Sequence, residues 1–492
     1  MLHVPSPDWR DQVIYFLMTD RFDDGEPGNN DQGAGEFAAG EAEKYNGGDL
    51  RGIERRIDYI KGLGATAIWI TPPVANQWRA PHSDITGYHG YWAEHFKKVD
   101  PHLGTLADYQ RLSSRIHCAG LYLVQDIVVN HTGDYFSYGP NWKPGRPESG
   151  YIAHDRTAPV PRPSQPPFDL NDPRRAADRQ AAVYHWTPNV SNYADSRQEM
   201  TFQMSGLDDL NTDNPRVRAA LRDSYAYWIR EAGVDAFRVD TAFYVAPGFF
   251  KDFLHSADAR NPGIDRVARA TGRDAFLVFG EGFGIDGPGQ TRQARKIEGY
   301  MNDRAGSPRM PGMLNFPLYG AIQNVIARGK PTSELGHRIE AMMKIHRRAH
   351  LMPTFVDNHD VDRFLAGASS TALKQALLAI MTLPGIPTIY YGTEQAFNVP
   401  RAAMFKAGYQ SGGYDRFDAD APLYTYIRTL TALRREHRVL SRGSPRILKS
   451  NDAGAGALVY DMKLGHERLV IALNTADTET LAANIETGLP AG

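Results

Sequence analysis

The stretch Phe237-Arg238-Val239-Asp240 is a short apolar run that ends on a carboxylate, and it holds the main clue to the fold. The chain has three comparable segments in a fixed order: Asp126-Ile127-Val128-Val129-Asn130-His131, Phe279-Gly280-Glu281-Gly282 and Asn358-His359-Asp360. Each apolar run is typical of a buried strand, and helical patterns lie between the runs. In a (β/α)8 barrel, residues at the carboxyl ends of many parallel strands meet at one face. We therefore expect this α/β fold, a TIM barrel, with a carboxylate-lined site at that face.

Eight apolar strand candidates alternate with helical patterns, as parallel strands joined by crossover helices do. They lie near residues 13–16, 66–70, 121–129, 234–240, 275–281, 313–317, 352–357 and 387–391. Residues 132–214 break the alternation, because they are rich in Pro, Gly, Asn and Asp and contain no long periodic element. So long a loop inside a compact domain is usually functional. We interpret it as an excursion domain after the third strand that forms one wall of a cleft.

These patterns divide the chain into a barrel over 1–131 and 215–442, the excursion domain B over 132–214, and a C-terminal all-β domain over 443–492. Short strands are expected in the last part at 457–460 and 469–474, and a third is suggested at 480–485. A seven-strand sandwich needs roughly 100 residues. The C-terminal β-sandwich is therefore expected to be incomplete, and the chain to be shorter than its natural product.

The bulk composition excludes several classes of protein. Of the 492 residues, 42% are hydrophobic and 23% charged, and the formal net charge of −2 gives no sign of a nucleic-acid partner. No run of about 18 apolar residues occurs, so no membrane-spanning helix is expected. The single cysteine, Cys118, excludes an intrachain disulfide and is expected in the core. No signal peptide is recognisable, which leaves the compartment open; processing of the N-terminus would favour an extracytoplasmic location.

The carboxylates have the pattern that glycoside hydrolysis needs, namely a nucleophile and an acid that stand about 5 Å apart in retaining enzymes. Arg238 lies on the same side of its strand as Asp240, so it can keep that carboxylate ionised and suited to attack. Glu281 lies among apolar neighbours, which raise a carboxyl pKa and suit a general acid. Each segment alone also fits a structural role, such as an ion pair, a turn or a helix cap. Their joint occurrence at four strand ends favours the catalytic interpretation.

The sequence resembles the α-amylase superfamily, glycoside hydrolase family 13, over roughly residues 10–440. Besides the segments above, the matching blocks are Gly-Ala-Thr-Ala-Ile-Trp-Ile-Thr-Pro (64–72), Gly-Tyr-His-Gly-Tyr-Trp (87–92), Leu-Asp-Asp-Leu-Asn (207–211), Gly-Val-Asp-Ala (233–236), Phe-Val-Asp (355–357) and Gly-Ile-Pro-Thr-Ile-Tyr-Tyr-Gly-Thr-Glu (385–394).

The resemblance implies a role for each matching residue. Asp240 would be the nucleophile, Glu281 the acid and then the base, and Asp360 the group that binds sugar hydroxyls and stabilises the transition state. The implied substrate-binding residues are His89, Tyr91, Asp126, His131, Arg238, His359, Phe243 and Tyr244. The last two depart from the family, which commonly has Lys-His there, with the Lys on the leaving-group side. An aromatic acceptor site would favour a sugar over water, and hence transglycosylation.

Two calcium sites are expected. The first lies in an oxygen-rich segment, which could also be a plain surface turn, but cyclodextrin glucanotransferases of this superfamily bind Ca²⁺ at a similar segment. Its expected ligands are Asp24, Glu26, Asn29, Asn30, Gly47 (through its carbonyl) and Asp49. The second, which the resemblance places between barrel and excursion domain, would use Asn130, Asp209 and the Tyr244 carbonyl.

The leading hypothesis is a retaining glycosidase that cleaves α-1,4 bonds of starch-like α-glucans or maltooligosaccharides, as an α-amylase or cyclomaltodextrinase does. Its first rival is an α-glucan transglycosylase, either a 4-α-glucanotransferase or a cyclodextrin-forming enzyme. An exo-acting α-glucosidase is also compatible with the sequence. A non-catalytic α-glucan-binding member is disfavoured, because such proteins typically lose the carboxylates that this chain keeps. The expected partner is the glucan alone, with no nucleic acid or membrane; the oligomeric state stays open.

Overall fold

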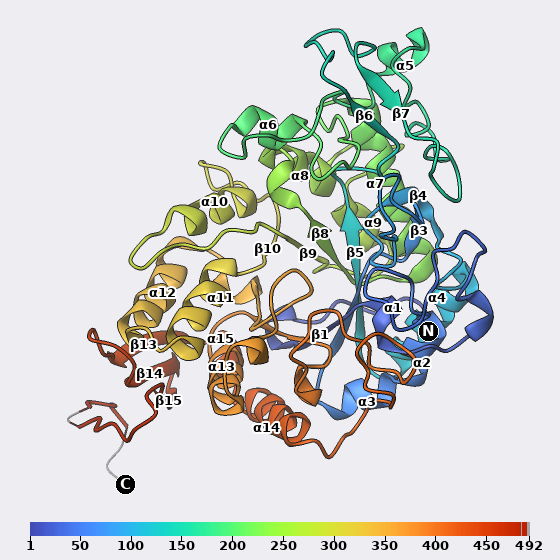
Figure 1. Cartoon of the computed structure of the whole chain (residues 1–492). Coiled ribbons are helices and arrows are strands. Elements are labelled where there is room, and N and C mark those ends of the chain that lie inside the picture. The colour runs from blue at the N-terminus through green and yellow to red at the C-terminus, as the bar shows by residue number, and fades with distance from the viewer. Residues whose placement is uncertain (484, 490–492) are drawn as a thin grey trace.

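The fold is a parallel barrel that carries a long excursion and a C-terminal antiparallel sheet (Figure 1). The structure is a computed structural model and describes residues 1–483 and 485–489. The barrel consists of eight strands that pair in parallel, in the order β10-β9-β8-β5-β2-β1-β12-β11. They are β1 (Ile14–Leu17), β2 (Ala67–Ile70), β5 (Tyr122–Val128), β8 (Ala236–Asp240), β9 (Leu277–Gly280), β10 (Gly312–Met313), β11 (Pro353–Thr354) and β12 (Ile386–Tyr390). This confirms the fold class predicted from the alternating pattern.

The two ends of the sheet meet at β10 and β11, which contain two residues each. The Asn315 N–H donates to the Pro353 carbonyl at 3.0 Å and joins these ends. Both strands are shorter than the apolar runs around them predict. The run near 313–317 gives way to a helix at Phe316, because Asn315 caps that helix by accepting from the Leu318 N–H and Pro317 occupies its first turn.

Helices surround the barrel, and their amphipathic faces pack on the strands. Gly233 ends the long helix α7 in the left-handed conformation (φ 65°), where a side chain would meet the Leu2 carbonyl, so only a glycine fits this helix end. The helices are α1 (Thr19–Phe22), α2 (Leu50–Arg55), α3 (Ile57–Gly62), α4 (Leu106–Cys118), α7 (Pro215–Ala232), α8 (Pro247–His255), α9 (Ile264–Ala270), α10 (Arg292–Met301), α11 (Phe316–Ile322), α12 (Thr332–Ile345), α13 (Ser370–Thr382), α14 (Pro422–Glu436) and α15 (Arg438–Arg442).

The excursion segment, residues 132–214, rises above the carboxyl ends of the barrel strands (Figure 1). It contains one small hairpin and two short helices: β6 (Phe136–Tyr138), β7 (Tyr151–Ala153), α5 (Ala176–Ala181) and α6 (Ser196–Thr201). Beside it lies a second hairpin, β3 (Val74–Asn76) with β4 (Ala93–Val99), which the strand patterns did not indicate. Both irregular regions thus border the face where the catalytic carboxylates were expected.

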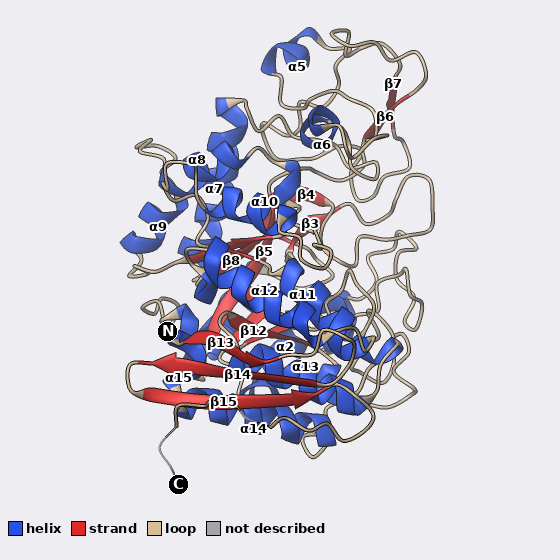
Figure 2. Cartoon of the chain, turned by 90° about the vertical axis from the view of Figure 1, so that its left-hand side faces the viewer, coloured by secondary structure: helices blue, strands red, loops and turns tan. Residues whose placement is uncertain are grey.

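The C-terminal residues form a three-stranded antiparallel sheet (Figure 2). It consists of β13 (Ser444–Lys449), β14 (Ala457–Leu464) and β15 (Glu467–Asn474). The suggested strand at 480–485 is wrong for 480–483 and 485, which have no regular structure, and residue 484 lies outside the described residues.

The expectation that Cys118 lies in the core is wrong, because this residue is exposed at the end of α4. Among residues 1–483 and 485–489, no helix has the length and the apolar character that a membrane span requires.

Candidate active site

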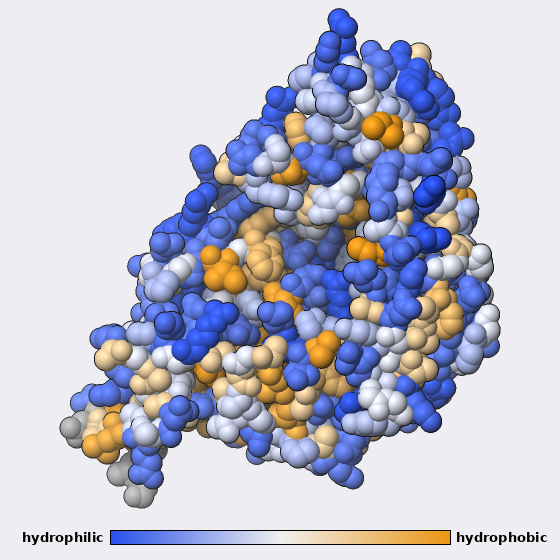
Figure 3. All heavy atoms as spheres, viewed as in Figure 1, coloured by the Kyte–Doolittle hydropathy of each residue, from blue (hydrophilic) through white to orange (hydrophobic). Residues whose placement is uncertain are grey.

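A cavity of about 750 Å³ opens between the excursion segment and the carboxyl ends of the barrel strands. On the face shown in Figure 3, the corresponding hollow has a largely hydrophilic floor with hydrophobic side chains at its rim. The structure brings together here all three predicted catalytic carboxylates and five of the predicted substrate-binding residues. These lining residues are Asp240, Glu281, Asp360, Tyr91, His131, Phe243, Tyr244 and His359.

The Arg238 guanidinium contacts three carboxyl groups of the site. Its Nη1 donates to Asp240 Oδ1 at 2.8 Å and to Asp126 Oδ1 at 2.9 Å, and its Nη2 lies 3.0 Å from Glu281 Oε2. The guanidinium is 1% exposed, so these ion pairs are shielded from water. One cation therefore holds the predicted nucleophile and the predicted acid side by side, as an arginine fork can do for two carboxyl groups.

The backbone around Glu281 and Asp240 is adapted to this arrangement. Thr241, which follows Asp240, has φ 48°, a left-handed conformation that is rare for a residue with a branched side chain. Its N–H donates to Glu281 Oε2 at 3.0 Å. Gly282 has no room for a side chain, since a Cβ there would lie 2.5 Å from the Phe243 ring. The Gly-Glu-Gly segment is thus closely packed and not a free turn.

Burial governs the electrostatics of the carboxyl pair, Asp240 (7% exposed) and Glu281 (8% exposed). Burial raises the pKa of Asp240, Arg238 opposes the shift, and the nearby carboxylates add to it. Burial also raises the pKa of Glu281, and Arg238 again opposes it. The sequence led us to expect that Arg238 would keep Asp240 ionised, but desolvation outweighs this cation and raises the pKa of Asp240. Two buried carboxyls beside one cation favour a state in which one of them keeps a proton.

A second chain of contacts leads from Asp126 to Asp360. The Tyr91 hydroxyl donates to Asp126 Oδ2 at 2.9 Å and lies 2.8 Å from His359 Nε2. His359 Nε2 lies 3.2 Å from Asp360 Oδ2, and the Tyr91 ring stacks on the His359 ring with centroids 5.4 Å apart. Asp126 and His359 are buried, whereas the Asp360 side chain is 33% exposed. Asp360 thus faces the cavity, and Asp126 supports it from below.

The two other predicted histidines are held by backbone contacts. His131 Nε2 lies 3.2 Å from the Tyr91 carbonyl, and His89 Nδ1 accepts from the Tyr91 N–H at 3.1 Å. Burial lowers the pKa of His131 to about 4, so this ring is neutral near pH 7. His89 stacks against Tyr91 behind the cavity wall. It therefore shapes the site through Tyr91 and is absent from the residues that line the cavity.

The sequence analysis missed several residues that line the cavity. Arg401 donates to the His359 carbonyl at 2.9 Å and lies 3.2 Å from Asp360 Oδ1. Lys296 on α10 and Glu199 on α6 form an ion pair, and the Lys296 ammonium lies 4.2 Å from the Phe243 ring centroid. Tyr193 packs edge-on against Tyr244. No local signal marks these residues, because each comes from a loop or helix far from the four carboxylate segments.

The first predicted calcium segment is folded around buried oxygens. Asp24 Oδ1, Asn29 Oδ1 and Asn30 Oδ1 are buried and have no hydrogen-bond partner among the described residues. Asp49 accepts from the N–H groups of Glu26 and Gly52 at 2.7 Å each. Burial raises the pKa of Asp49 to about 6. Glu26, in contrast, forms an ion pair with Arg51, and so its carboxylate is engaged elsewhere.

Of the second set of predicted calcium ligands, Asn130 and Asp209 lie close together, but the Asp209 carboxylate has another partner. The Leu210 N–H donates to the Asn130 carbonyl at 2.9 Å, which places Asp209 beside Asn130. His185 Nδ1 lies 2.5 Å from Asp209 Oδ2, and so a histidine occupies the Asp209 carboxylate. Tyr244 lies on the short helix Ala242–Tyr244 beyond β8. Among the described residues, none of these three predicted ligands has a buried side-chain oxygen that lacks a hydrogen-bond partner. The arrangement therefore does not fit a calcium ion.

Comparison with known proteins places this geometry in context. The model of the family "Alpha amylase, catalytic domain" matches residues 16–411. The chain is 29% identical to a cyclomaltodextrin glucanotransferase of Klebsiella oxytoca, over 96% of this chain and 72% of the relative. Among solved structures, a three-domain cyclomaltodextrin glucanotransferase superposes with a TM-score of 0.76 at 28% identity, covering 94% of this chain and 87% of that one.

An α-amylase of Geobacillus thermoleovorans, solved in complex with acarbose, has a TM-score of 0.69 at 29% identity and covers 95% of this chain and 88% of that one. The length of the match varies among the curated relatives. The chain spans 61–62% of the length of several glucanotransferases and 34% of the length of one other relative.

Proposed function

The chain belongs to the alpha-amylase catalytic-domain family, and on that premise we propose that it is a retaining enzyme that cleaves α-1,4-glucosidic bonds in starch-like α-glucans or maltooligosaccharides. The family contains glycoside hydrolases and glycosyl transferases, so the finer assignment rests on the site. The observation that carries it is the contact of Asp240 and Glu281 with the two Nη atoms of one buried guanidinium, that of Arg238.

The proposed reaction has two steps. We assign to Glu281 the proton that the carboxyl pair keeps. Glu281 gives this proton to the glycosidic oxygen while the ionised Asp240 attacks the anomeric carbon, and the carbon–oxygen bond to the leaving sugar breaks. The ionised Glu281 then takes a proton from water or from an acceptor hydroxyl, whose oxygen displaces Asp240 from the anomeric carbon. Each displacement inverts the configuration at the anomeric carbon, so the two steps together retain the α configuration. Arg238 stays protonated throughout and compensates the negative charge that moves between the two carboxyl groups.

The remaining polar residues would hold the sugar in the cleaved subsite. Asp360, which is partly exposed, would accept hydrogen bonds from ring hydroxyls, and Arg401 would fix its orientation. His131 and His359 would contact the same sugar, with Asp126 and Tyr91 behind them. Tyr91 would stack on the apolar face of the ring, as aromatic side chains do in sugar sites.

Transglycosylation is the second candidate, and a specific observation favours it. Phe243 and Tyr244 line the cavity next to Glu281, and Tyr193 packs on Tyr244. Aromatic surfaces bind a sugar better than water, so an acceptor glucan could intercept the covalent intermediate before hydrolysis does. The two functions share every step up to this intermediate and differ only in the acceptor.

The test is incubation of the purified protein with maltoheptaose, soluble starch and a cyclodextrin, with products resolved over time. Shorter oligosaccharides alone, released as the α-anomer, would support the hydrolase. Products longer than the substrate, or cyclic products, would support the transglycosylase. If none of the three substrates is turned over in the presence of Ca²⁺, the α-1,4-glucan assignment is wrong, and the non-catalytic binding protein becomes the better explanation.

A calcium ion also belongs to this proposal, at the first predicted site. Three unpartnered buried oxygens, on Asp24, Asn29 and Asn30, fit a hard cation that takes six to eight oxygen ligands. Asp49 and the Gly47 carbonyl would complete the set, while Glu26 is held by Arg51. A bound cation would neutralise the carboxylates that burial now destabilises, and would hold the loop of 24–30 against α2. The second site is not proposed in its predicted form, because His185 occupies Asp209.

A further inference from the structure

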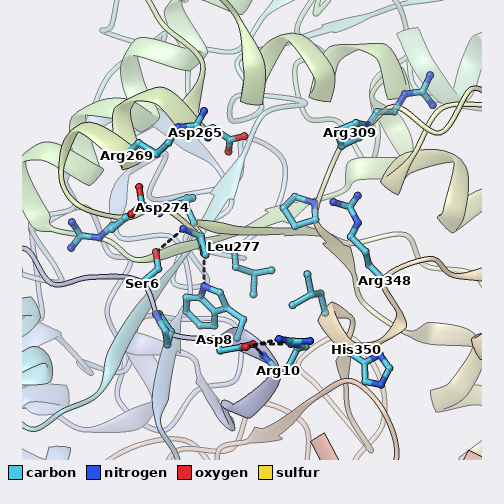
Figure 4. Close-up of a pocket in the computed structure, with 18 of the residues that line it drawn as sticks. Ser6, Asp8, Arg10, Asp265, Arg269, Asp274, Leu277, Arg309, Arg348 and His350 are labelled. Atoms are coloured by element: carbon cyan, nitrogen blue, oxygen red, sulfur yellow. Dashed lines mark hydrogen bonds and ion pairs between the residues drawn. The ribbon is translucent and has the colours of Figure 1, made fainter. Parts of the chain in front are cut away.

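A second cavity, of about 790 Å³, lies at the opposite end of the barrel from the candidate active site. Its lining includes the start of β9 and the residues just before β10 and β11, so it opens at the amino ends of these strands (Figure 4). The N-terminal segment, residues 6–10, forms one wall. We call it the basal cavity; it has the size of a small-molecule site, roughly 300–1,000 Å³.

The basal cavity has an excess of cationic side chains. Its lining contains six arginines against three aspartates, Asp8, Asp265 and Asp274. Asp8 pairs with Arg10 and Arg442, and Asp265 pairs with His255. Arg273 pairs with Asp235 outside the lining. The four other arginines have no carboxylate within ion-pair distance in the described part of the chain; they are Arg269, Arg309, Arg347 and Arg348.

Two of these guanidinium groups have an N–H donor without an acceptor among the described residues. Arg348 donates from Nη2 to the Met301 and Met310 carbonyls, and Arg309 donates from Nη1 to the Gly299 carbonyl. The Nε atoms of both are buried without a partner among the described residues. A partly buried cation without an ion-pair partner is costly, and an anion bound in the cavity would offset that cost. Burial lowers the pKa of Arg348, and the nearby Glu298 opposes the shift only in part.

The floor of the cavity is apolar. Trp9, Phe276, Leu277 and Leu351 line it together with three prolines. In Figure 4, Arg10, Arg269, Arg309 and Arg348 are distributed around Leu277, which lies near the centre of the view. A ligand that satisfies this site therefore needs an anionic group for the arginines and an apolar or aromatic part for the floor.

We propose that the basal cavity binds a small phosphorylated molecule, with the phosphate on the unpaired arginines and an apolar or aromatic part on the floor. Arginine forms paired hydrogen bonds to phosphate oxygens, which favours a phosphate over a halide or another small ion. The volume exceeds what a phosphate ion alone would fill. A nucleoside monophosphate has the required combination and is the probe of choice.

Isothermal titration calorimetry of the full chain tests this with AMP, with inorganic phosphate and with adenosine. AMP is expected to bind at least about tenfold more tightly than either part alone, because only AMP uses both the arginines and the floor. In the double variant Arg309→Gln/Arg348→Gln, affinity for AMP should fall about tenfold or more. Arg309 and Arg348 also donate to backbone carbonyls, so replacing them also removes contacts of the fold. Arg269→Gln/Arg347→Gln is therefore a second variant, which removes two charges of the cavity lining from exposed positions.

The matched control is Arg216→Gln/Arg435→Gln, two exposed arginines outside the cavity, which should leave AMP binding unchanged. The proposal is wrong if AMP produces no heat of binding up to ~10 mM, or if it binds equally well to all three double variants. It is also wrong if inorganic phosphate binds as tightly as AMP, since the site would then be a simple anion site. Because the readout is binding, these outcomes do not depend on the proposed glucan activity.

Discussion

Lys296 on α10 and Glu199 on α6 form an ion pair, with Lys296 Nζ 2.7 Å from Glu199 Oε1, that joins the barrel to the excursion segment. Both residues line the cavity of Asp240 and Glu281, and the Lys296 ammonium also lies over the Phe243 ring. The position where the family commonly has a lysine is Phe243 here, yet a lysine from another helix lies beside it. The cationic group on this side of the cavity is therefore present, although it comes from a different part of the chain.

The first prediction concerns this lysine. Lys296→Ala should lower kcat/KM for maltoheptaose about tenfold, because one charge-assisted hydrogen bond to the leaving sugar is lost. For 4-nitrophenyl α-maltoside, whose leaving group is not a sugar, the fall should be less than about twofold. Lys330→Ala, an exposed lysine away from the cavity, is the control. An equal fall on both substrates would mean that Lys296 only supports the excursion segment.

The second prediction separates the two carboxyl groups. Glu281→Gln should slow the cleavage of maltoheptaose by about 10²–10⁴, because the leaving sugar is no longer protonated. The same variant should cleave α-maltosyl fluoride with a much smaller loss, since fluoride leaves without a proton. Asp240→Asn should lose both activities, because no nucleophile remains. If the two variants treat the fluoride alike, the assignment of acid and nucleophile is wrong.

The third prediction concerns calcium. Added Ca²⁺ should raise Tm by a few degrees, since a ligand at 100 times its Kd contributes about 2.7 kcal/mol to the folded state. Asp49→Asn should abolish this rise, whereas Asp31→Asn, an exposed neighbour, should keep it. Calcium needs the ionised carboxylate, and burial raises the pKa of Asp49 to about 6. The rise in Tm should therefore diminish as pH falls through about 6; calorimetry that shows it unchanged in Asp49→Asn would exclude this site.

The fourth prediction is a pH dependence of stability set by His102. Burial lowers its pKa, but Asp100 at 2.7 Å and Glu36 at 3.1 Å outweigh burial and raise the pKa to about 9. The folded protein thus binds a proton that the unfolded chain loses above about pH 6.5. This contribution, on the order of 3 kcal/mol, is fully present below pH 6.5 and is lost as pH rises through 9.

The matching variant is His102→Gln, whose Tm should lie well below that of the wild type at pH 6 and approach it by pH 9. Scanning calorimetry at several pH values measures the difference. His95→Gln is the control, since burial and two nearby lysines lower the pKa of His95 to about 4 and it stays neutral over this range. A Tm difference for His102→Gln that is constant from pH 6 to 9 would show that His102 is not charged in the folded protein.

Much of the fold could be predicted from the sequence, because its signals are local. The run that ends at Asp240 is the strand β8, as predicted. The predictions failed where a strand end is decided by its neighbours. The run near 313–317 looks like a strand but turns into α11, and the C-terminal sheet uses β13 rather than residues 480–483 and 485.

What the sequence by itself determined is the order of the strands and the placement of Asp240, Glu281 and Asp360 beyond them, because apolar patterns and backbone preferences are local to each segment. Only the tertiary structure decided that Arg238 bridges Asp240 and Glu281, and that burial outweighs this cation in setting their pKa values. The contact of His185 with the Asp209 carboxylate was likewise decided by the tertiary structure. It also brought Lys296 and Arg401 into the cavity and the arginines into the basal cavity. Such contacts join residues distant in sequence, and their energies depend on distance and desolvation, which exist only once the chain is folded.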